Sequence, residues 1–134
     1  MTRQARLGNL GLGSVGLATG RVAIGVVALL RPALVARPWV GGAQASAPAG
    51  VVLGRALGGR DLALGAGALL AAWCGDERAL RAWTLAGAFC DGVDAVATAA
   101  SWRDLPALGR LAVAGAATAG AVLGGSTVLR AARR

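Results

Sequence analysis

Four long apolar stretches, separated by short polar or charged segments, account for most of this 134-residue chain. Each stretch has about the 20 residues that an α-helix needs to cross a hydrocarbon core of about 30 Å. The frequent glycines do not argue against helices, because membrane-spanning helices tolerate glycine better than soluble ones do. The pattern predicts an all-α fold: one transmembrane domain, a four-span helical bundle with short loops. The predicted spans cover about residues 9–30, 49–74, 82–101 and 107–129.

The connection between the first two spans is the longest one. It follows Arg31 and Pro32, where the pyrrolidine ring ends or kinks the first helix. For residues 33–48 we expect a short helix lying at the membrane interface in the first half. The second half has the composition of a loop, with glycine, serine, glutamine and proline.

The composition supports a membrane protein. Hydrophobic residues make up 56% of the chain and charged residues 15%, against about 25% charged residues in ordinary soluble domains. The net charge of +8 comes from arginine, since the sequence has neither lysine nor histidine. A nucleic-acid-binding surface would cluster these arginines on one face. Here they mostly lie at the ends of the apolar stretches, which favours contact with a lipid bilayer and argues against a nucleic-acid partner.

The arginines outside the predicted spans or in the first turn of one also indicate an orientation. One side would hold Arg3, Arg6, Arg78, Arg81, Arg130, Arg133 and Arg134, and the other Arg31, Arg37, Arg103 and Arg110. Because the cytoplasmic side of a membrane protein carries more basic residues, both termini are predicted to be cytoplasmic. All four tryptophans fall at predicted span boundaries, as in an interfacial aromatic belt. They are Trp39, Trp73, Trp83 and Trp102.

Three basic and three acidic residues lie inside the predicted spans and away from their ends. Unpaired, each would cost about 2.5–3.5 kcal/mol at the centre of a membrane helix. They must therefore face inward and pair, or reach a wet cavity. They are Arg21, Arg55, Arg60, Asp61, Asp91 and Asp94, and they form our candidate polar network or ligand site.

Axial depth suggests which of these charges meet. With a rise of 1.5 Å per residue, Arg60 and Asp91 reach similar depths near the middle of the membrane. By the same estimate Arg21 and Arg55 approach Asp94. We therefore expect an ionic network that joins the first three spans.

Helical spacing places small and polar residues on the same faces. A polar stripe recurs at i+3 and i+4 along the third span, and a similar stripe follows Ser14, Ala18, Arg21, Gly25 and Ala28 in the first. Repeated G-x-x-x-G spacing predicts close helix approach, within this chain or in a homo-oligomer. The third-span stripe is Thr84, Gly87, Asp91, Asp94, Thr98 and Ser101, and the helix-packing glycines are Gly50, Gly54, Gly58, Gly120 and Gly124, with Gly16 and Gly20 repeating the motif.

Catalytic chemistry finds little support. No histidine is available as an acid–base partner or metal ligand, and Cys74 and Cys90 show neither C-x-x-C nor metal spacing. The sequence contains no G-x-S-x-G or H-E-x-x-H motif. We therefore predict no catalytic residue, no metal site and no cofactor.

Three stretches resemble a known group of proteins. They are G-R-V-A-I-G-V-V-A-L-L-R-P with the tryptophan at 39, then R-A-L-G-G-R-D-L-A-L-G, then D-G-V-D. The chain is similar over roughly residues 20–130 to small four-helix membrane proteins of actinobacteria, a family of unknown function. The resemblance implies four spans and a bacterial plasma membrane, and it brings no activity or substrate.

These observations favour a non-enzymatic accessory, assembly or scaffold subunit that forms a homo-oligomer or joins a larger membrane complex. The alternative is a small transporter or channel that uses the charged network for protons or for an anionic or lipid-like ligand. A membrane enzyme or redox partner with a quinone-like substrate is a third hypothesis, supported only by the charges inside the spans.

Overall fold

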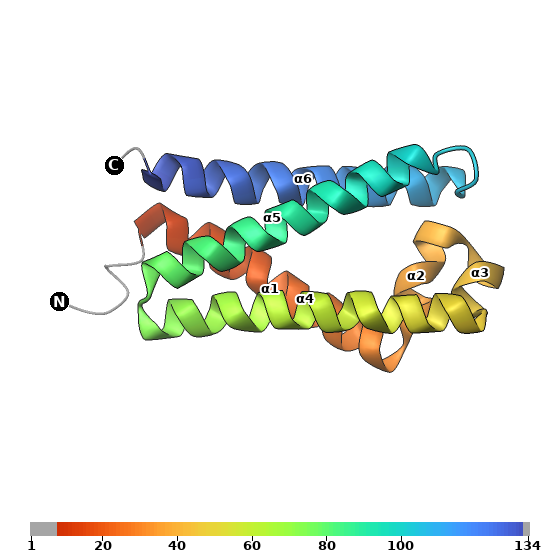
Figure 1. The fold of residues 1–134 in the computed structure, drawn as a ribbon, viewed down its shortest axis with the longest axis horizontal. Coiled ribbons are helices and arrows are strands. Elements are labelled where there is room, and N and C mark those ends of the chain that lie inside the picture. Colours follow the sequence, from red (N-terminus) through yellow and green to blue (C-terminus); the bar gives the residue numbers. More distant parts are fainter. Residues whose placement is uncertain (1–7, 133–134) are drawn as a thin grey trace.

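The computed structural model describes residues 8–132, and these contain six α-helices and no strand (Figure 1). The all-α prediction is therefore confirmed for the described part of the chain. Four of the helices are long and two are short. The helices are α1 (Gly8–Leu30), α2 (Pro32–Val40), α3 (Gly42–Ser46), α4 (Pro48–Cys74), α5 (Glu77–Ala100) and α6 (Ala107–Ala132).

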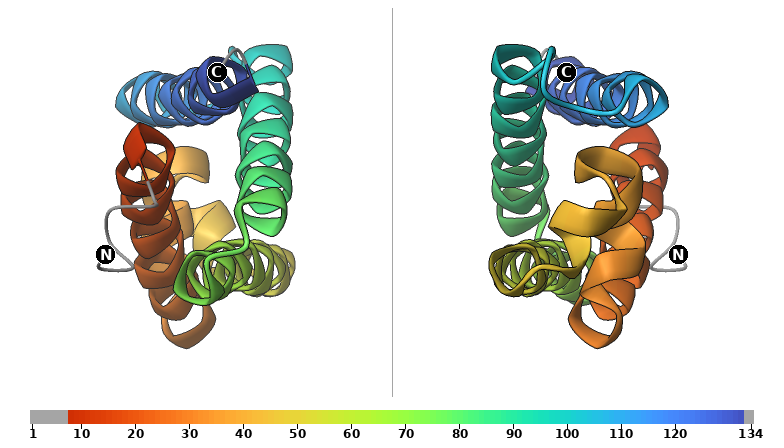
Figure 2. Two further views of the ribbon diagram at one scale, coloured as in Figure 1. Left: turned by 90° about the vertical axis from the view of Figure 1, so that its left-hand side faces the viewer. Right: turned by 90° about the vertical axis from the view of Figure 1, so that its right-hand side faces the viewer.

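The long helices form an up-and-down bundle. Viewed along its length, α1, α4, α5 and α6 stand at the corners of a square, each beside the next in chain order and α6 beside α1 (Figure 2). The start of α1, the α4–α5 turn and the end of α6 lie at one end of the bundle (Figure 1). The opposite end holds α2, α3 and the α5–α6 connection, and we call it the α2–α3 end.

The α4–α5 turn is short because its sequence both stops and starts a helix. Gly75 ends α4 in the left-handed conformation, with φ 71°, where a side chain would be strained. Asp76 then begins α5 as its N-cap, and its carboxylate accepts a hydrogen bond of 2.9 Å from the backbone N–H of Ala79. Two residues therefore reverse the chain and make α4 and α5 antiparallel neighbours.

The connector after α1 differs from the prediction in its second half. The predicted loop contains the helix α3, and only the bends at Gly41 and Ala47 interrupt helical structure. Gly41 has φ 88°, a value that glycine adopts without strain, and it lets α3 turn away from α2. Small residues with few competing side-chain hydrogen bonds let a single helical turn form where composition indicates a loop.

Helix α2 is the short helix expected in the first half of the connector, and its place at a membrane interface stays a prediction. It packs against α1, α4 and α6 within the α2–α3 end of the bundle (Figure 2). The indole Nε1 of Trp39 donates a hydrogen bond of 3.1 Å to the Thr98 hydroxyl of α5. Trp39 is thus partly buried and joined to α5, while its place in an interfacial aromatic belt stays a prediction.

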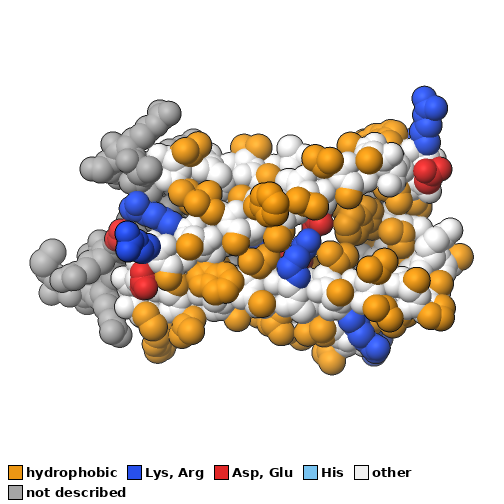
Figure 3. All heavy atoms as spheres, viewed as in Figure 1, with side chains coloured by type: hydrophobic (Ala, Val, Ile, Leu, Met, Phe, Trp, Pro, Cys, Tyr) orange, Lys and Arg blue, Asp and Glu red, His pale blue; other side chains and the backbone are white. Residues whose placement is uncertain are grey.

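Small side chains fill the core, and large ones lie outside. Of the nine buried hydrophobic residues described, six are alanines, and the buried polar side chains are Ser14, Thr84 and Thr98. By contrast, the large apolar side chains of Leu12, Trp73 and many others are exposed. Figure 3 shows hydrophobic side chains along the whole length of one face, with few charged groups between its ends.

Two of the described helices are long and apolar enough to cross a membrane by length and composition. The spans are Leu12–Leu30 in α1 and Ala107–Ser126 in α6, with a mean hydropathy of 1.7 and 1.4. Helices α4 and α5 do not meet this criterion, because the charged residues inside them lower their mean hydropathy. The prediction of four spans is therefore not supported by hydropathy alone.

The glycines predicted to pack helices lie where another element comes close. A Cβ atom on Gly58 would lie 2.8 Å from Ala28 Cβ of α1, and one on Gly54 would lie 2.9 Å from Pro32 Cβ. Gly50 faces the backbone of Gln44, and Gly124 faces Ala88 of α5. Such close approach requires residues without a side chain.

Three other glycines give a different picture. Gly120 of α6 faces the carboxylate of Asp91, so it accommodates a charged group and not only a neighbouring helix. Gly16 and Gly20, which repeat the motif in α1, have no atom within 4 Å of an added Cβ, so they pack no helix within the described part of this chain.

Candidate functional site: a mixed ionic cluster inside the bundle

The polar stripes expected on α1 and α5 face the interior. Along α1, Ser14, Ala18, Gly25 and Ala28 are buried and Arg21 is partly buried. Along α5, Thr84, Gly87 and Thr98 are buried and the two aspartates are partly buried, whereas Ser101 is exposed beyond the end of the helix. The stripes of α1 and α5 therefore point toward the same interior.

Arg21 is the centre of the cluster. Its guanidinium lies 3.1 Å from Asp61 of α4 through Nη1 and 2.5 Å from Asp91 of α5 through Nη2. Nη2 also donates a hydrogen bond of 2.9 Å to the backbone carbonyl of Gly87. One side chain of α1 thus joins two other helices and satisfies a carbonyl on one of them.

Arg60 provides the second link, between α4 and α5. It forms a fork on Asp94, with Nη1–Oδ1 at 3.1 Å and Nη2–Oδ2 at 2.7 Å. Nη2 also lies 3.3 Å from Asp61, so both arginines share that carboxylate. This bidentate geometry is among the strongest arrangements for an arginine–carboxylate pair.

The cluster has an unequal number of charges. Two guanidinium groups face three carboxylates, which leaves one net negative charge. The five side chains keep between 15% and 27% of their surface exposed, so they are shielded without being sealed from the surroundings. The Nε of Arg60 is buried and has no hydrogen-bond partner among the described residues.

The pairing differs from the one expected from axial depth. Arg60 binds Asp94 and not Asp91, and Arg21 binds Asp91 and not Asp94. Depth along the axis cannot distinguish two aspartates one helical turn apart, because the direction of each side chain around its helix decides which partner it meets.

Arg55 lies outside the cluster. Its side chain is exposed on α4, and its Nε donates a hydrogen bond of 3.4 Å to the backbone carbonyl of Leu29 at the end of α1. Five of the six predicted network residues therefore come together and Arg55 does not. Arg55 follows Gly54, the residue of α4 that packs on α2, and Gly54 lies about two helical turns before Asp61 of the cluster.

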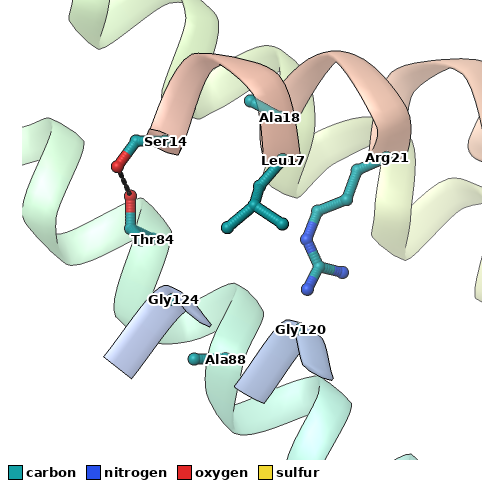
Figure 4. A pocket seen from close by; sticks show the side chains of 8 residues that line it. All are labelled: Ser14, Leu17, Ala18, Arg21, Thr84, Ala88, Gly120 and Gly124. Atoms are coloured by element: carbon teal, nitrogen blue, oxygen red, sulfur yellow. Dashed lines mark hydrogen bonds between the residues drawn. The ribbon is translucent and has the colours of Figure 1, made fainter. Parts of the chain in front are cut away.

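A small cavity lies beside the cluster, between α1, α5 and α6 (Figure 4). It has a volume of about 20 Å³, close to the space that one water molecule needs. Arg21 points into it from one side, and at the other side the Thr84 hydroxyl donates a hydrogen bond of 3.1 Å to Ser14 Oγ. The cavity is lined by Ser14, Leu17, Ala18, Arg21, Thr84, Ala88, Gly120 and Gly124.

Two partners of the cluster escaped the sequence interpretation. Trp39 contacts the polar stripe through Thr98, whose hydroxyl in turn donates a hydrogen bond of 2.7 Å to the Asp94 carbonyl. Gly120 provides the space that the Asp91 carboxylate occupies. The need of a buried indole N–H for an acceptor is a signal that could have suggested the first contact, but nothing in the sequence indicates the second.

Chemically, the arrangement can hold helices in register or bind a small positive charge. Within residues 8–132 no group of three or more histidine, cysteine or acidic side chains is placed to hold a metal ion. Both cysteines are free thiols: Cys74 is exposed, and Cys90, which precedes Asp91 on α5, is half-buried. The arginines and aspartates of the cluster offer ion pairing.

No family model, no curated protein and no solved structure matches this chain. The resemblance to four-helix actinobacterial membrane proteins consequently stays a prediction from the sequence.

Proposed function

We propose that the chain is a small integral membrane protein of a bacterial plasma membrane that crosses the bilayer four times and acts as a non-enzymatic accessory, assembly or scaffold subunit. The observation that carries the proposal is the distribution of side-chain size: alanine and glycine inside, leucine, valine and aromatic residues outside. Water-soluble bundles bury their large apolar side chains, whereas lipid solvates them as well as a protein core does.

The arrangement of the helices extends the argument from two spans to four. The two apolar spans in α1 and α6 are only 22% and 17% buried, unlike the core helix of a soluble protein. Helices α4 and α5 complete the same square and extend along the bundle from one end to the other, with α5 inclined (Figures 1 and 2). Apart from exposed Arg55 and the charges in the first two turns of α5, their charges lie in the ionic cluster. Their outer faces present Val52, Leu53, Phe89, Val93 and Val96.

The ionic cluster supports a structural role. Alanine and glycine surfaces are smooth, so they permit many sliding positions of one helix along another. Ion pairs between α1, α4 and α5 favour one of these sliding positions. Specifying register is the best-attested use of buried polar groups. In this proposal the cluster fixes a rigid four-helix unit, which then associates with itself or with a larger complex, with both termini cytoplasmic.

Comparing a single substitution with a double one tests this role. Arg60→Gln leaves three carboxylates facing one guanidinium, whereas Arg60→Gln with Asp94→Asn removes a complete pair and restores the original imbalance. We expect the single variant to lose folded protein in a mild detergent and the double variant to recover much of it. Wild-type protein should stay with the membrane after extraction at alkaline pH. Release into the soluble fraction would overturn the membrane assignment, and equal losses in both variants would overturn the structural role.

A second function is favoured by one specific observation. The net negative charge of the cluster offers a place for a proton or a small cation, as a transporter or channel would need, and Arg21, which pairs with two of the carboxylates, lines a water-sized cavity. Reconstitution into vesicles with an enclosed pH-sensitive dye tests it. A proton flux that Asp91→Asn abolishes and a matched substitution at exposed Asp104 preserves would favour transport over the structural role.

A further inference from the structure

Two arginines lie at one corner of the bundle outside the ionic cluster. Arg31 ends the junction between α1 and α2, and Arg55 lies on α4 beside it. Their neighbours in the sequence form a close contact: a Cβ on Gly54 would lie 2.9 Å from Pro32 Cβ. Arg55 follows Gly54 and Arg31 precedes Pro32, so the two arginines flank this contact. Arg55 also reaches the Leu29 carbonyl, two residues before Arg31.

Neither of these arginines has an acidic partner among the described residues. Both are exposed, and among the side chains that the structure describes every Arg–carboxylate pair involves Arg21, Arg60 or Arg81. The contact from Arg55 to Leu29 uses one N–H of the five that a guanidinium donates, at a long 3.4 Å. The Nη1 and Nη2 groups of Arg55 are thus available for another acceptor.

The surroundings of these arginines are apolar. Leu30 is 75% exposed, Val52 is 66% exposed, and Leu34 and Leu53 are also exposed. Arg55 lies about 10 Å along α4 from its start at Pro48. In the proposed membrane this depth is below the headgroups, where a charge without a partner is costly and its long side chain extends toward the surface.

We propose that Arg31 and Arg55 bind the phosphate of an anionic phospholipid headgroup at the α2–α3 end of the bundle, with its acyl chains lying against Leu30, Leu34, Val52 and Leu53. The chemistry fits because arginine forks bind phosphate oxygens through two parallel hydrogen bonds. A lipid is favoured over a free phosphate ion because the site combines two cations with exposed apolar side chains. The inference rests on the membrane location proposed above.

Native mass spectrometry tests the site. Protein purified in mild detergent is mixed with phosphatidylglycerol, phosphatidylcholine or inorganic phosphate, and the bound molecules are counted. We expect one phosphatidylglycerol retained in preference to phosphatidylcholine, and Arg55→Gln should weaken its binding about fivefold or more. Arg31→Gln should also weaken phosphatidylglycerol binding, and it replaces Arg55→Gln in the measurement if Arg55→Gln does not fold.

Arg103→Gln is the matched control, since it removes the same charge from an exposed position at the same end of the bundle. It should leave the retained lipid unchanged. Equal binding of both lipids, equal loss in all three variants, or retention of inorganic phosphate without lipid would overturn the site. None of these results would contradict the membrane location, which the alkaline extraction tests separately. A protein that stays soluble without detergent would overturn the proposed function itself.

Discussion

Arg21 shows how much of this bundle depends on single side chains. Its guanidinium contacts two carboxylates and a backbone carbonyl, and these acceptors belong to two different helices. Its own helix contributes no other charge to the cluster. The consequence of a substitution in the cluster should therefore depend on the sign of the charge that it removes.

Removing an arginine should cost more than removing an aspartate. Arg21→Gln leaves three carboxylates with one guanidinium, whereas Asp94→Asn leaves two of each. We expect Arg21→Gln to lose about 3–5 kcal/mol, the range for breaking a buried ion pair, and Asp94→Asn to lose clearly less. Thermal melting in detergent, followed by circular dichroism, measures both. Arg78→Gln, at an exposed position in the first turn of α5, is the control, and a larger loss in Asp94→Asn would contradict the charge argument.

Gly120 should matter because of the carboxylate next to it. A Cβ at this position would overlap Asp91 Oδ2, so Gly120→Ala must displace the carboxylate from Arg21. We expect a loss of about 1–3 kcal/mol, typical of overpacking. Gly115→Ala is the matched control on the same helix, because an added Cβ there meets nothing within 4 Å. Both variants gain the same helix propensity, so equal melting temperatures would contradict the prediction.

At this scale the sequence predicts which residues face inward better than which residues pair. A period of 3.6 residues places Arg21, Asp91 and Asp94 on inward faces, and the structure has them there. Pairing needs the direction of each side chain and the relative shift of the helices, which the periodicity of one helix does not contain. Arg55 shows the limit: it lies within an apolar stretch, as the cluster residues do, yet it faces outward.

At the scale of elements, the long helices and the short helix α2 depend on different information. The bounds of the long helices follow from signals that can be read in the sequence: Pro48 begins α4, and Gly75 and Asp76 separate α4 from α5. The position of α2 follows from tertiary contacts, above all Trp39 with Thr98 and Pro38 with Gly109. Sequence therefore predicts where the long helices lie, and only the fold shows that α2 enters the bundle.

The hydrogen bond of Trp39 should hold α2 in place. Trp39→Phe keeps an aromatic ring and removes the N–H donor, leaving the Thr98 hydroxyl without this partner. We expect a loss of about 1–2 kcal/mol and faster amide hydrogen exchange in Pro32–Val40. Trp73→Phe is the control, since Trp73 is 78% exposed. Unchanged exchange in α2 would show that apolar packing alone holds this helix.

At the scale of the whole molecule, the fold places three connections at two ends. The α4–α5 turn lies at one end, and α2, α3 and the α5–α6 connection lie at the other (Figure 1). Hydropathy recognises α1 and α6 as spans because their charges are few, and it misses α4 and α5 because their charges count against them wherever they point. A property averaged over a window cannot separate a charge paired inside the bundle from one facing lipid, and for that reason the four-span arrangement has to be tested directly.

Cysteine labelling tests it. In a background with Cys74→Ala and Cys90→Ala, Glu77→Cys places a thiol at the start of α5, next to the α4–α5 turn, and Ser46→Cys places one at the opposite end, both at exposed positions. If all four long helices cross the bilayer, an impermeant maleimide reaches Ser46→Cys in intact cells and Glu77→Cys only in inverted vesicles, since the arginine distribution puts the turn in the cytoplasm. The reverse pattern would keep four spans and invert the orientation. Labelling of both thiols from one side would contradict four spans, because α4 alone connects the two positions and would then not cross the membrane.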